Sequence, residues 1–540
     1  MKYFLFPALI ILSGCQSTLL TQKNTDKTYL PSDQIASTTE INQALLADES
    51  IDIIHPVEDV TFSLKDKTLQ STDDVWQRIR EQITFNIPQN KRLIVQRDWY
   101  AKHPSYLTRV AKRAEPFLYY IVEELEKNDV PIELALLPVV ESAFDPFAYS
   151  HGRASGMWQF IPGTGTRFNM KQNWWYDGRR DVIASTAGAI KYMKYLHKFF
   201  DGDWLLALAA YNSGEGRVQK AVRKNKRLGK NTDFWSLDLP KETRAYVPKL
   251  LALADIVKRP EHFGLKLHEI ANEEVIAQVD IKSQLDLAKA ASLAGLSLAE
   301  LQRLNPGFNR WSTDPNGPHR LLLPKHKIAH FEEGLAKLSK DERLAWQRYK
   351  IKNGDNLGHI SKKFHTSIEL IRQVNNINGN QIRAGKYLLI PVAAKSLDSY
   401  ILSEDQRIAK KQAKTQQGIK ITHNVISGDN LWDLGQRYKV NGSNIAKWNG
   451  FAPRDSLKLG QKLVIWQKPT MALKRNNQNI EQAIMRNITY KVRSGDSLAR
   501  IANKFNIRIS DIERWNSLSR NKYLQPGQRL KLSVDVTNNI

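Results

Sequence analysis

The last third of this 540-residue chain repeats one pattern three times, and this repeat constrains the fold more than any other feature. Each copy has a Gly-Asp pair, an asparagine 21 residues after that glycine, and then a second glycine. The pairs are Gly354-Asp355, Gly428-Asp429 and Gly495-Asp496, the asparagines are Asn375, Asn449 and Asn516, and the closing glycines are Gly385, Gly460 and Gly527. Because a fixed period indicates repeated structural units, we predict three copies of one small module, at residues 346–393, 422–467 and 488–535.

Each copy also has the same order of local patterns. A short apolar strand precedes the Gly-Asp turn, two helical segments follow it, and a strand such as Tyr387–Ile390 follows the closing glycine. This order predicts a small α+β module of the βααβ type. The pattern resembles the LysM family, which implies binding of peptidoglycan and other glycans that contain N-acetylglucosamine. The resemblance implies glycan contacts at the Gly-Asp turns and the repeat asparagines, and we call the copies LysM 1, LysM 2 and LysM 3.

Residues 261–345 carry a weaker version of the same pattern. Leu287 and Asn305 have the spacing of Leu357 and Asn375, but the Gly-Asp pair is missing. We predict a degenerate LysM-like module, with a packing spacer as the alternative. The linkers at about residues 393–421 and 467–487 are rich in Lys, Gln and Asn, so we expect the modules to move separately and to bind by avidity.

The N-terminus has the pattern of a secreted, lipid-anchored protein. Lys2 precedes an apolar stretch ending at Leu12, which is shorter than the roughly 20 residues that span a bilayer but suits a secretory signal. Leu12-Ser13-Gly14-Cys15 resembles the bacterial lipobox, which implies removal of the signal peptide, residues 1–14, and acylation of Cys15, the chain's one cysteine. A plain signal peptide is the alternative. Gln16, where an aspartate would favour the inner membrane, indicates the periplasmic face of the outer membrane.

Length and composition indicate several domains. Single cores stop growing at about 250 to 300 residues, so a chain of this length is divided. Residues 15–70 are polar and are expected to form a flexible tether, whereas residues 71–260 have apolar side chains at helical spacing and predict a mainly α-helical catalytic domain. The formal net charge of +25 fits anionic lipid or wall polymers, or only a solvated surface. Dispersed basic residues and the secretion signal argue against nucleic acid as a partner.

Glu141 is the candidate catalytic acid of the helical domain. Pro131 predicts a helix start, and the apolar residues Leu137 and Val140 place Glu141 in a hydrophobic setting at the helix end. Burial raises the pKa of a carboxyl group, which a general acid working near neutral pH requires. A lone glutamate at a helix end is usually solvated, so this segment alone leaves its role open.

Further segments carry polar side chains suited to a sugar substrate. They are Ser150, the Gly156–Thr164 loop with Met157 and Gln159, the run Ala210-Tyr211-Asn212-Ser213-Gly214, and Glu242–Val247 with Tyr246. With Glu141-Ser142-Ala143-Phe144 they resemble the catalytic domain of lytic transglycosylases, which have a goose-lysozyme-like fold and cleave the bond between N-acetylmuramic acid and N-acetylglucosamine. Together with the lipobox and the repeats, the chain resembles the membrane-bound lytic murein transglycosylase D group.

This resemblance implies roles for individual residues. Glu141 is the acid that becomes the base, and the products carry 1,6-anhydromuramyl ends. Substrate binding or support of the catalytic carboxyl group is implied for Ser142, Ser150, Met157, Gln159, Tyr211, Asn212 and Tyr246. No metal or organic cofactor is implied, and none of the histidines falls in a ligand-spaced cluster.

Two other functions remain open from the sequence. A hydrolase needs two carboxyl groups, and the nearest second candidate, Asp145, precedes Pro146 and suits a turn equally well. Hydrolysis of the same bond, as in goose-type lysozymes, would leave reducing ends. A wall-binding scaffold with an inactive domain would leave the glycan uncut.

Overall fold

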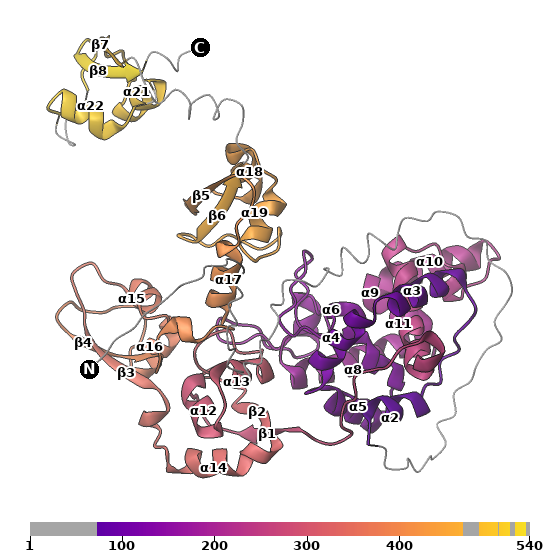
Figure 1. The fold of residues 1–540 in the computed structure, drawn as a ribbon. Coiled ribbons are helices and arrows are strands. Elements are labelled where there is room, and N and C mark those ends of the chain that lie inside the picture. The colour runs from indigo at the N-terminus through magenta and orange to yellow at the C-terminus, as the bar shows by residue number, and fades with distance from the viewer. Residues whose placement is uncertain (1–72, 468–484, 506, 519–523, 536–540) are drawn as a thin grey trace, which may run out of the picture. The chain divides into compact units, whose positions relative to one another are not determined.

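The computed structural model describes residues 73–467, 485–505, 507–518 and 524–535, which fall into two compact units (Figure 1). The first unit contains the described residues up to Asp145 together with Thr186–Ile276, and the second contains Pro146–Ser185 and the chain from Ala277 onward. The predicted catalytic domain therefore contributes to both units. The predicted signal peptide, Cys15 and the whole predicted tether lie outside the described residues. None of the described helices is long and apolar enough to cross a membrane.

The first unit is entirely helical. Its elements are α2 (Val75–Glu81), α3 (Lys91–Lys102), α4 (Pro104–Ala114), α5 (Leu118–Lys127), η2 (Ile132–Leu136), α6 (Leu137–Ser142), most of α8 (Val182–Phe199), α9 (Trp204–Ser213), α10 (Glu215–Arg227), η3 (Phe234–Ser236), α11 (Lys241–Lys258) and η4 (Pro260–Phe263). Helix α11 is buried from Tyr246 to Val257, as expected for a helix that is apolar on all sides. It packs against α3 and α9, so its side chains are held by neighbours on several faces.

The second unit begins with residues 146–185, which include α7 (Pro162–Arg167), and continues with four βααβ modules. The degenerate module contains β1 (Ile276–Asp280), α12 (Leu287–Ala294), α13 (Leu298–Leu304) and β2 (Arg320–Pro324), and is followed by η5 (Lys325–Lys327), α14 (Ile328–Lys337) and η6 (Asp341–Arg343). LysM 1 contains β3 (Ala345–Lys350), α15 (Leu357–Lys363), α16 (Ile368–Val374) and β4 (Tyr387–Val392). LysM 2 contains β5 (Ile419–Asn424), α18 (Leu431–Tyr438), α19 (Gly442–Trp448) and β6 (Lys462–Gln467). LysM 3 contains β7 (Met485–Lys491), α21 (Leu498–Phe505), α22 (Ile509–Trp515) and β8 (Arg529–Asp535).

The three LysM modules share one register. Each has a two-stranded antiparallel sheet, in which Tyr349 pairs with Leu388, His423 with Leu463 and Tyr490 with Leu530. Each module also has its own small cluster of buried apolar side chains between the sheet and the two helices. The predicted fold class, a helical domain followed by small α+β modules, is confirmed.

The linker after LysM 1 is folded, whereas its polar composition predicted a flexible segment. It contains η7 (Leu397–Ser399) and α17 (Glu404–Ala413). The Tyr400 ring is 1% exposed, and its hydroxyl group lies 3.0 Å from both carboxyl oxygens of Asp286 in the degenerate module. Arg310 of that module pairs with Glu404 at 2.7 Å. The polar composition of the linker hid this one buried aromatic side chain, while residues 468–484 of the second linker lie outside the described residues.

Candidate active site

Glu141 lies in the last turn of α6, where the backbone makes a sharp turn. Helix α6 has a proline in its first turn and ends at Ala143, which has a φ of 53°. The next residue, Phe144, has a φ of 57° and is fully buried. Two successive non-glycine residues with positive φ are unusual and persist only where packing imposes them. The turn after the catalytic candidate is therefore fixed by the core, and Ser142 contributes to it by donating a hydrogen bond to the Pro138 carbonyl oxygen at 3.2 Å.

Glu141 is partly buried, and its carboxyl group has one short hydrogen bond. The Tyr246 hydroxyl group donates to Oε1 of Glu141 at 2.6 Å. Burial raises the pKa of Glu141 to about 7, and the negative charge of Glu242 adds to the rise, while Tyr246 and Lys249 oppose it. A carboxyl group with this pKa is present in both protonation states at neutral pH, which suits a group that must give and then take a proton.

Helix α11 supplies most of the groups that act on this carboxyl group. Glu242, Tyr246 and Lys249 stand at positions i, i+4 and i+7, so they share one face of the helix. Lys249 is 6% exposed, and burial lowers its pKa to about 8. Neither Glu242 nor Lys249 is among the site residues predicted from the sequence, although their helical spacing from Tyr246 could have identified both.

The end of α9 brings the other two predicted support residues into the same unit. The Asn212 side-chain oxygen accepts a hydrogen bond of 2.8 Å from the Thr243 hydroxyl group, which ties the end of α9 to the start of α11. Burial, and then the charge of Glu141, raise the pKa of Tyr211 well above its usual value, so this phenol stays protonated. The structure thus brings Glu141, Tyr211, Asn212 and Tyr246 together within one unit.

Three residues predicted to bind substrate, Ser150, Met157 and Gln159, lie in the second unit. The side chains of Ser150 and Gln159 form hydrogen bonds within their own loop. The Ser150 hydroxyl oxygen accepts a hydrogen bond from the Ala154 amide at 3.0 Å, and the Gln159 side chain donates to the Gly156 carbonyl oxygen at 2.7 Å. Met157 is 0% exposed. The Met157 side chain is thus part of the core, and its role in substrate binding or catalytic support stays a prediction.

The repeat asparagines have a structural role inside each module. In LysM 1 the Asn375 amide donates to the Leu389 carbonyl oxygen and accepts from the Leu389 amide, both at 2.8 Å. Asn449 makes the same pair of bonds to Val464, and Asn516 makes it to Lys531. These side chains join the second helix to the second strand, so folding of the module accounts for the constant spacing of the asparagines, and their contact with glycan stays a prediction.

The repeat Gly-Asp turns are likewise built from internal bonds. The glycines Gly354, Gly428 and Gly495 have φ values of 85°, 90° and 85°, a region that favours glycine. The aspartates accept from backbone amides three residues earlier and from the side chain of the first strand: Asp355 from Tyr349, Asp429 from His423 and Asp496 from Tyr490.

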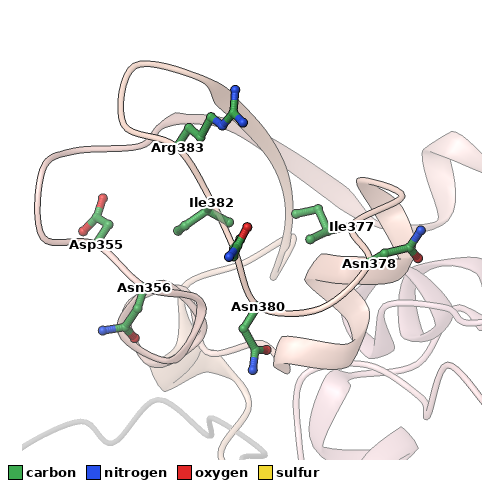
Figure 2. A pocket seen from close by; sticks show the side chains of 8 residues that line it. Asp355, Asn356, Ile377, Asn378, Asn380, Ile382 and Arg383 are labelled. Carbon is green, nitrogen blue, oxygen red and sulfur yellow. The ribbon is translucent and has the colours of Figure 1, made fainter.

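A pocket of about 530 Å³ lies beside the first of these turns in LysM 1 (Figure 2). Its lining residues are Asp355, Asn356, Ile377, Asn378, Asn380, Gln381, Ile382 and Arg383. In Figure 2 Asp355 and Asn356 belong to the first loop, and the labelled residues from Ile377 to Arg383 belong to the loop between the second helix and the second strand. Amide groups and an arginine around two isoleucines suit a sugar, which has polar edges and apolar faces.

Comparisons with known proteins agree with this architecture. The model of the transglycosylase SLT domain matches residues 119–234, and the model of the LysM-like domain of lytic transglycosylase MltD matches residues 275–340. The LysM domain model matches residues 349–391, 423–466 and 490–533. These matches define a lytic transglycosylase with C-terminal LysM modules.

The relatives identify the family. Membrane-bound lytic murein transglycosylase D of Escherichia coli strain K12 is 38% identical over 405 residues, which cover 73% of this chain and 86% of that protein. A putative tributyltin chloride resistance protein of an Alteromonas species is 46% identical over 166 residues, or 30% of this chain and 80% of that one. The solved structure of the 70 kDa soluble lytic transglycosylase Slt70 of Escherichia coli matches with a TM-score of 0.23 and 20% identity, over 36% of this chain and 38% of that one. The chain belongs to the membrane-bound lytic murein transglycosylase D family.

Proposed function

We propose that this enzyme cleaves the β-1,4 bond between N-acetylmuramic acid and N-acetylglucosamine of peptidoglycan and leaves 1,6-anhydromuramyl ends, in cell-wall remodelling or turnover. The observation that carries the proposal is Glu141, a partly buried carboxyl group with a pKa of about 7 that accepts a 2.6 Å hydrogen bond from Tyr246. Such a group can protonate a glycosidic oxygen near neutral pH.

The mechanism uses Glu141 twice. It first gives its proton to the glycosidic oxygen while the muramyl acetamide assists departure of the leaving sugar. The resulting carboxylate then takes the proton from the C6 hydroxyl group of the muramyl residue, whose oxygen attacks C1 and closes the anhydro ring. Tyr246 stabilises the carboxylate between these two steps, because a hydrogen bond to the charged form lowers its energy. Asn212 ties the end of α9 to the start of α11, and the protonated phenol of Tyr211 lies near the Glu141 charge.

The test is mass spectrometry of the muropeptides that the protein releases from purified sacculi, with Glu141→Gln as the matched variant. Anhydro-ended fragments that disappear in the variant are the expected result. Reducing ends would instead assign hydrolysis, and Asp145 would then be the next residue to change. Release of nothing by the unchanged protein would leave a wall-binding scaffold.

We also propose that the LysM modules hold the enzyme on peptidoglycan and that acylated Cys15 anchors it at the periplasmic face of the outer membrane. The pocket of LysM 1 supports the first part, with Asn378 and Arg383 in its lining. The lipobox resemblance and the position of Gln16 support the second. Membrane fractionation tests the anchor: Cys15→Ala should release the protein from membranes, and Gln16→Asp should move it to the inner membrane.

A further inference from the structure

The degenerate module has the same internal frame as LysM 1. The Asn305 amide donates to the Leu322 carbonyl oxygen and its oxygen accepts from the Leu322 amide, both at 2.8 Å, as Asn375 does with Leu389. The two modules can therefore be compared loop by loop. In both modules, the loop after the first strand lies beside the loop after the second helix.

These two loops enclose a pocket in LysM 1 but are bonded to each other in the degenerate module. The Thr313 amide donates to the Leu285 carbonyl oxygen at 3.0 Å, and the Leu287 amide donates to the Trp311 carbonyl oxygen at 2.9 Å. Trp311, Thr313 and Asp314 are at most 2% exposed. The region that could receive a sugar in LysM 1 is occupied here by the module's own backbone.

The second-helix loop of the degenerate module instead pairs with residues 175–177. The Asp177 amide donates to the Gly307 carbonyl oxygen at 2.8 Å, and the Asn309 amide donates to the Trp175 carbonyl oxygen at 2.7 Å. Gly307 allows this approach, because a Cβ atom there would lie 2.7 Å from the Tyr176 ring. The contact is therefore a short antiparallel ladder with a close-packed aromatic ring.

Charged side chains strengthen both ends of this contact. Asp314, which is 0% exposed, accepts from Lys171 at 2.8 Å and from Asn173 at 2.6 Å. Arg320 pairs with Asp181 at 2.7 Å. Because the Asp314 side chain is fully buried, loss of Lys171 would leave a buried charge without its ion pair.

A chain of polar contacts runs from this interface to the loop that carries Gln159. Arg180 donates to the Asn309 side-chain oxygen at 2.8 Å and to Asp177 at 3.2 Å. Asp177 also accepts two hydrogen bonds of 2.9 Å from Arg179. Arg179 donates in turn to the carbonyl oxygens of Arg153 and Phe160, at 2.8 and 3.2 Å.

The backbone of the 153–160 loop packs tightly against Arg179 at Gly156. Gly156 has a φ of 83°, and a Cβ atom there would lie 1.9 Å from the Arg179 carbonyl oxygen. Arg179 thus holds residues 153–160 through its hydrogen bonds and its close backbone contact with Gly156, and Asp177 holds the Arg179 side chain in place.

We propose that the degenerate module is not a glycan-binding module but a positioning element: it holds residues 171–181 and, through Asp177 and Arg179, sets the conformation of the 153–160 loop of the catalytic domain. Its effect on catalysis rests on the proposed function, whereas its effect on the loop does not. Asn309 is the positioning residue that links the two segments.

The test compares Asn309→Ala with Asn309→Asp in the full chain. The alanine variant removes the acceptor for Arg180, and the aspartate variant keeps an oxygen at that place. We expect hydrogen exchange in residues 153–160 to be faster in Asn309→Ala and restored in Asn309→Asp. We also expect the rate of muropeptide release at saturating sacculi to fall roughly tenfold in Asn309→Ala, the size associated with a lost hydrogen bond to a charged group, with unchanged sedimentation with sacculi.

Two comparisons keep the outcomes distinct. Asn378→Ala in the LysM 1 pocket should weaken sedimentation and leave hydrogen exchange in residues 153–160 unchanged, the reverse of Asn309→Ala. Weakened sedimentation with a normal rate in Asn309→Ala, or unchanged exchange in residues 153–160, would overturn the proposal. If Asn309→Ala does not fold, Lys171→Ala, which removes one partner of Asp314, gives the same exchange measurement. If the unchanged protein releases no product, the proposed function fails while the exchange experiment still decides the positioning role.

Discussion

The hydroxyl group of Tyr246 lies 2.6 Å from the carboxyl group of Glu141, although the two residues are 105 positions apart. This hydrogen bond joins the last turn of α6 to the first part of α11. It also opposes the rise in pKa that burial imposes on Glu141. The bond therefore sets both the position and the protonation of the proposed acid.

Tyr246→Phe should raise the pKa of Glu141 above about 7, because the variant loses a hydrogen bond that favours the charged form. The alkaline limb of the pH–rate profile should move to higher pH, and the maximal rate should fall roughly tenfold, since the carboxylate loses its donor. Tyr106→Phe is the matched control, because the Tyr106 hydroxyl group donates to the Val139 carbonyl oxygen at 3.4 Å and not to the carboxyl group. An unchanged alkaline limb in Tyr246→Phe would contradict the assignment.

Glu242→Gln and Lys249→Met should shift the pKa of Glu141 in opposite directions. The charge of Glu242 raises this pKa and that of Lys249 lowers it. We therefore expect the alkaline limb at lower pH in Glu242→Gln and at higher pH in Lys249→Met, measured as the pH dependence of muropeptide release. Shifts in the same direction would show that the changes act through packing instead of charge.

Glu141→Gln should stabilise the protein at alkaline pH. A carboxyl group whose pKa is higher in the folded protein than in the unfolded chain favours folding at low pH, and this contribution is lost as pH rises from about 4.5 to about 7. Above that range the charged group costs up to about 3 kcal/mol, which the neutral amide avoids. Thermal unfolding at pH 5 and pH 8 should show a gain in Tm for the variant that is larger at pH 8. A gain of equal size at both pH values would mean that ionisation of Glu141 is not its cause.

Asn375→Ala should destabilise LysM 1, because it leaves the Leu389 amide and carbonyl groups without their partner. The loss is about 1–3 kcal/mol, the usual cost of an unsatisfied polar group, and hydrogen exchange in β4 measures it. Asn378→Ala, in the pocket lining, should weaken binding to sacculi with little effect on exchange. If Asn375→Ala reduced binding without loosening β4, the asparagine would be a glycan ligand after all.

Local patterns were sufficient to predict several parts of the molecule. The βααβ order followed from turn residues and periodicity, and the position of Glu141 at a helix end followed from the apolar residues before it. Both depend on contacts close in the sequence. The repeat spacing also depends on contacts close in the sequence. It marks the asparagine that joins the second helix of each module to the second strand.

The remaining features depend on contacts between distant segments, which a single sequence does not reveal. Lys249 and Glu242 matter because α11 passes Glu141, and Met157 is core because its loop is closed by Arg179. The folded linker depends on Tyr400 with its acceptor Asp286, more than 100 residues earlier, and on the ion pair of Glu404 with Arg310. Composition could not indicate any of these contacts.

The folded linker changes how LysM 1 contributes to binding. A repeat on a flexible tether loses translational and rotational freedom each time it settles on a polymer, and this entropy reduces its affinity. LysM 1 is held to the degenerate module by a shared core that includes Leu370 and Tyr400, so this loss of freedom occurs once, during folding. Its pocket is consequently preorganised relative to the module beside it, and a glycan strand that reaches that pocket meets a site of fixed orientation.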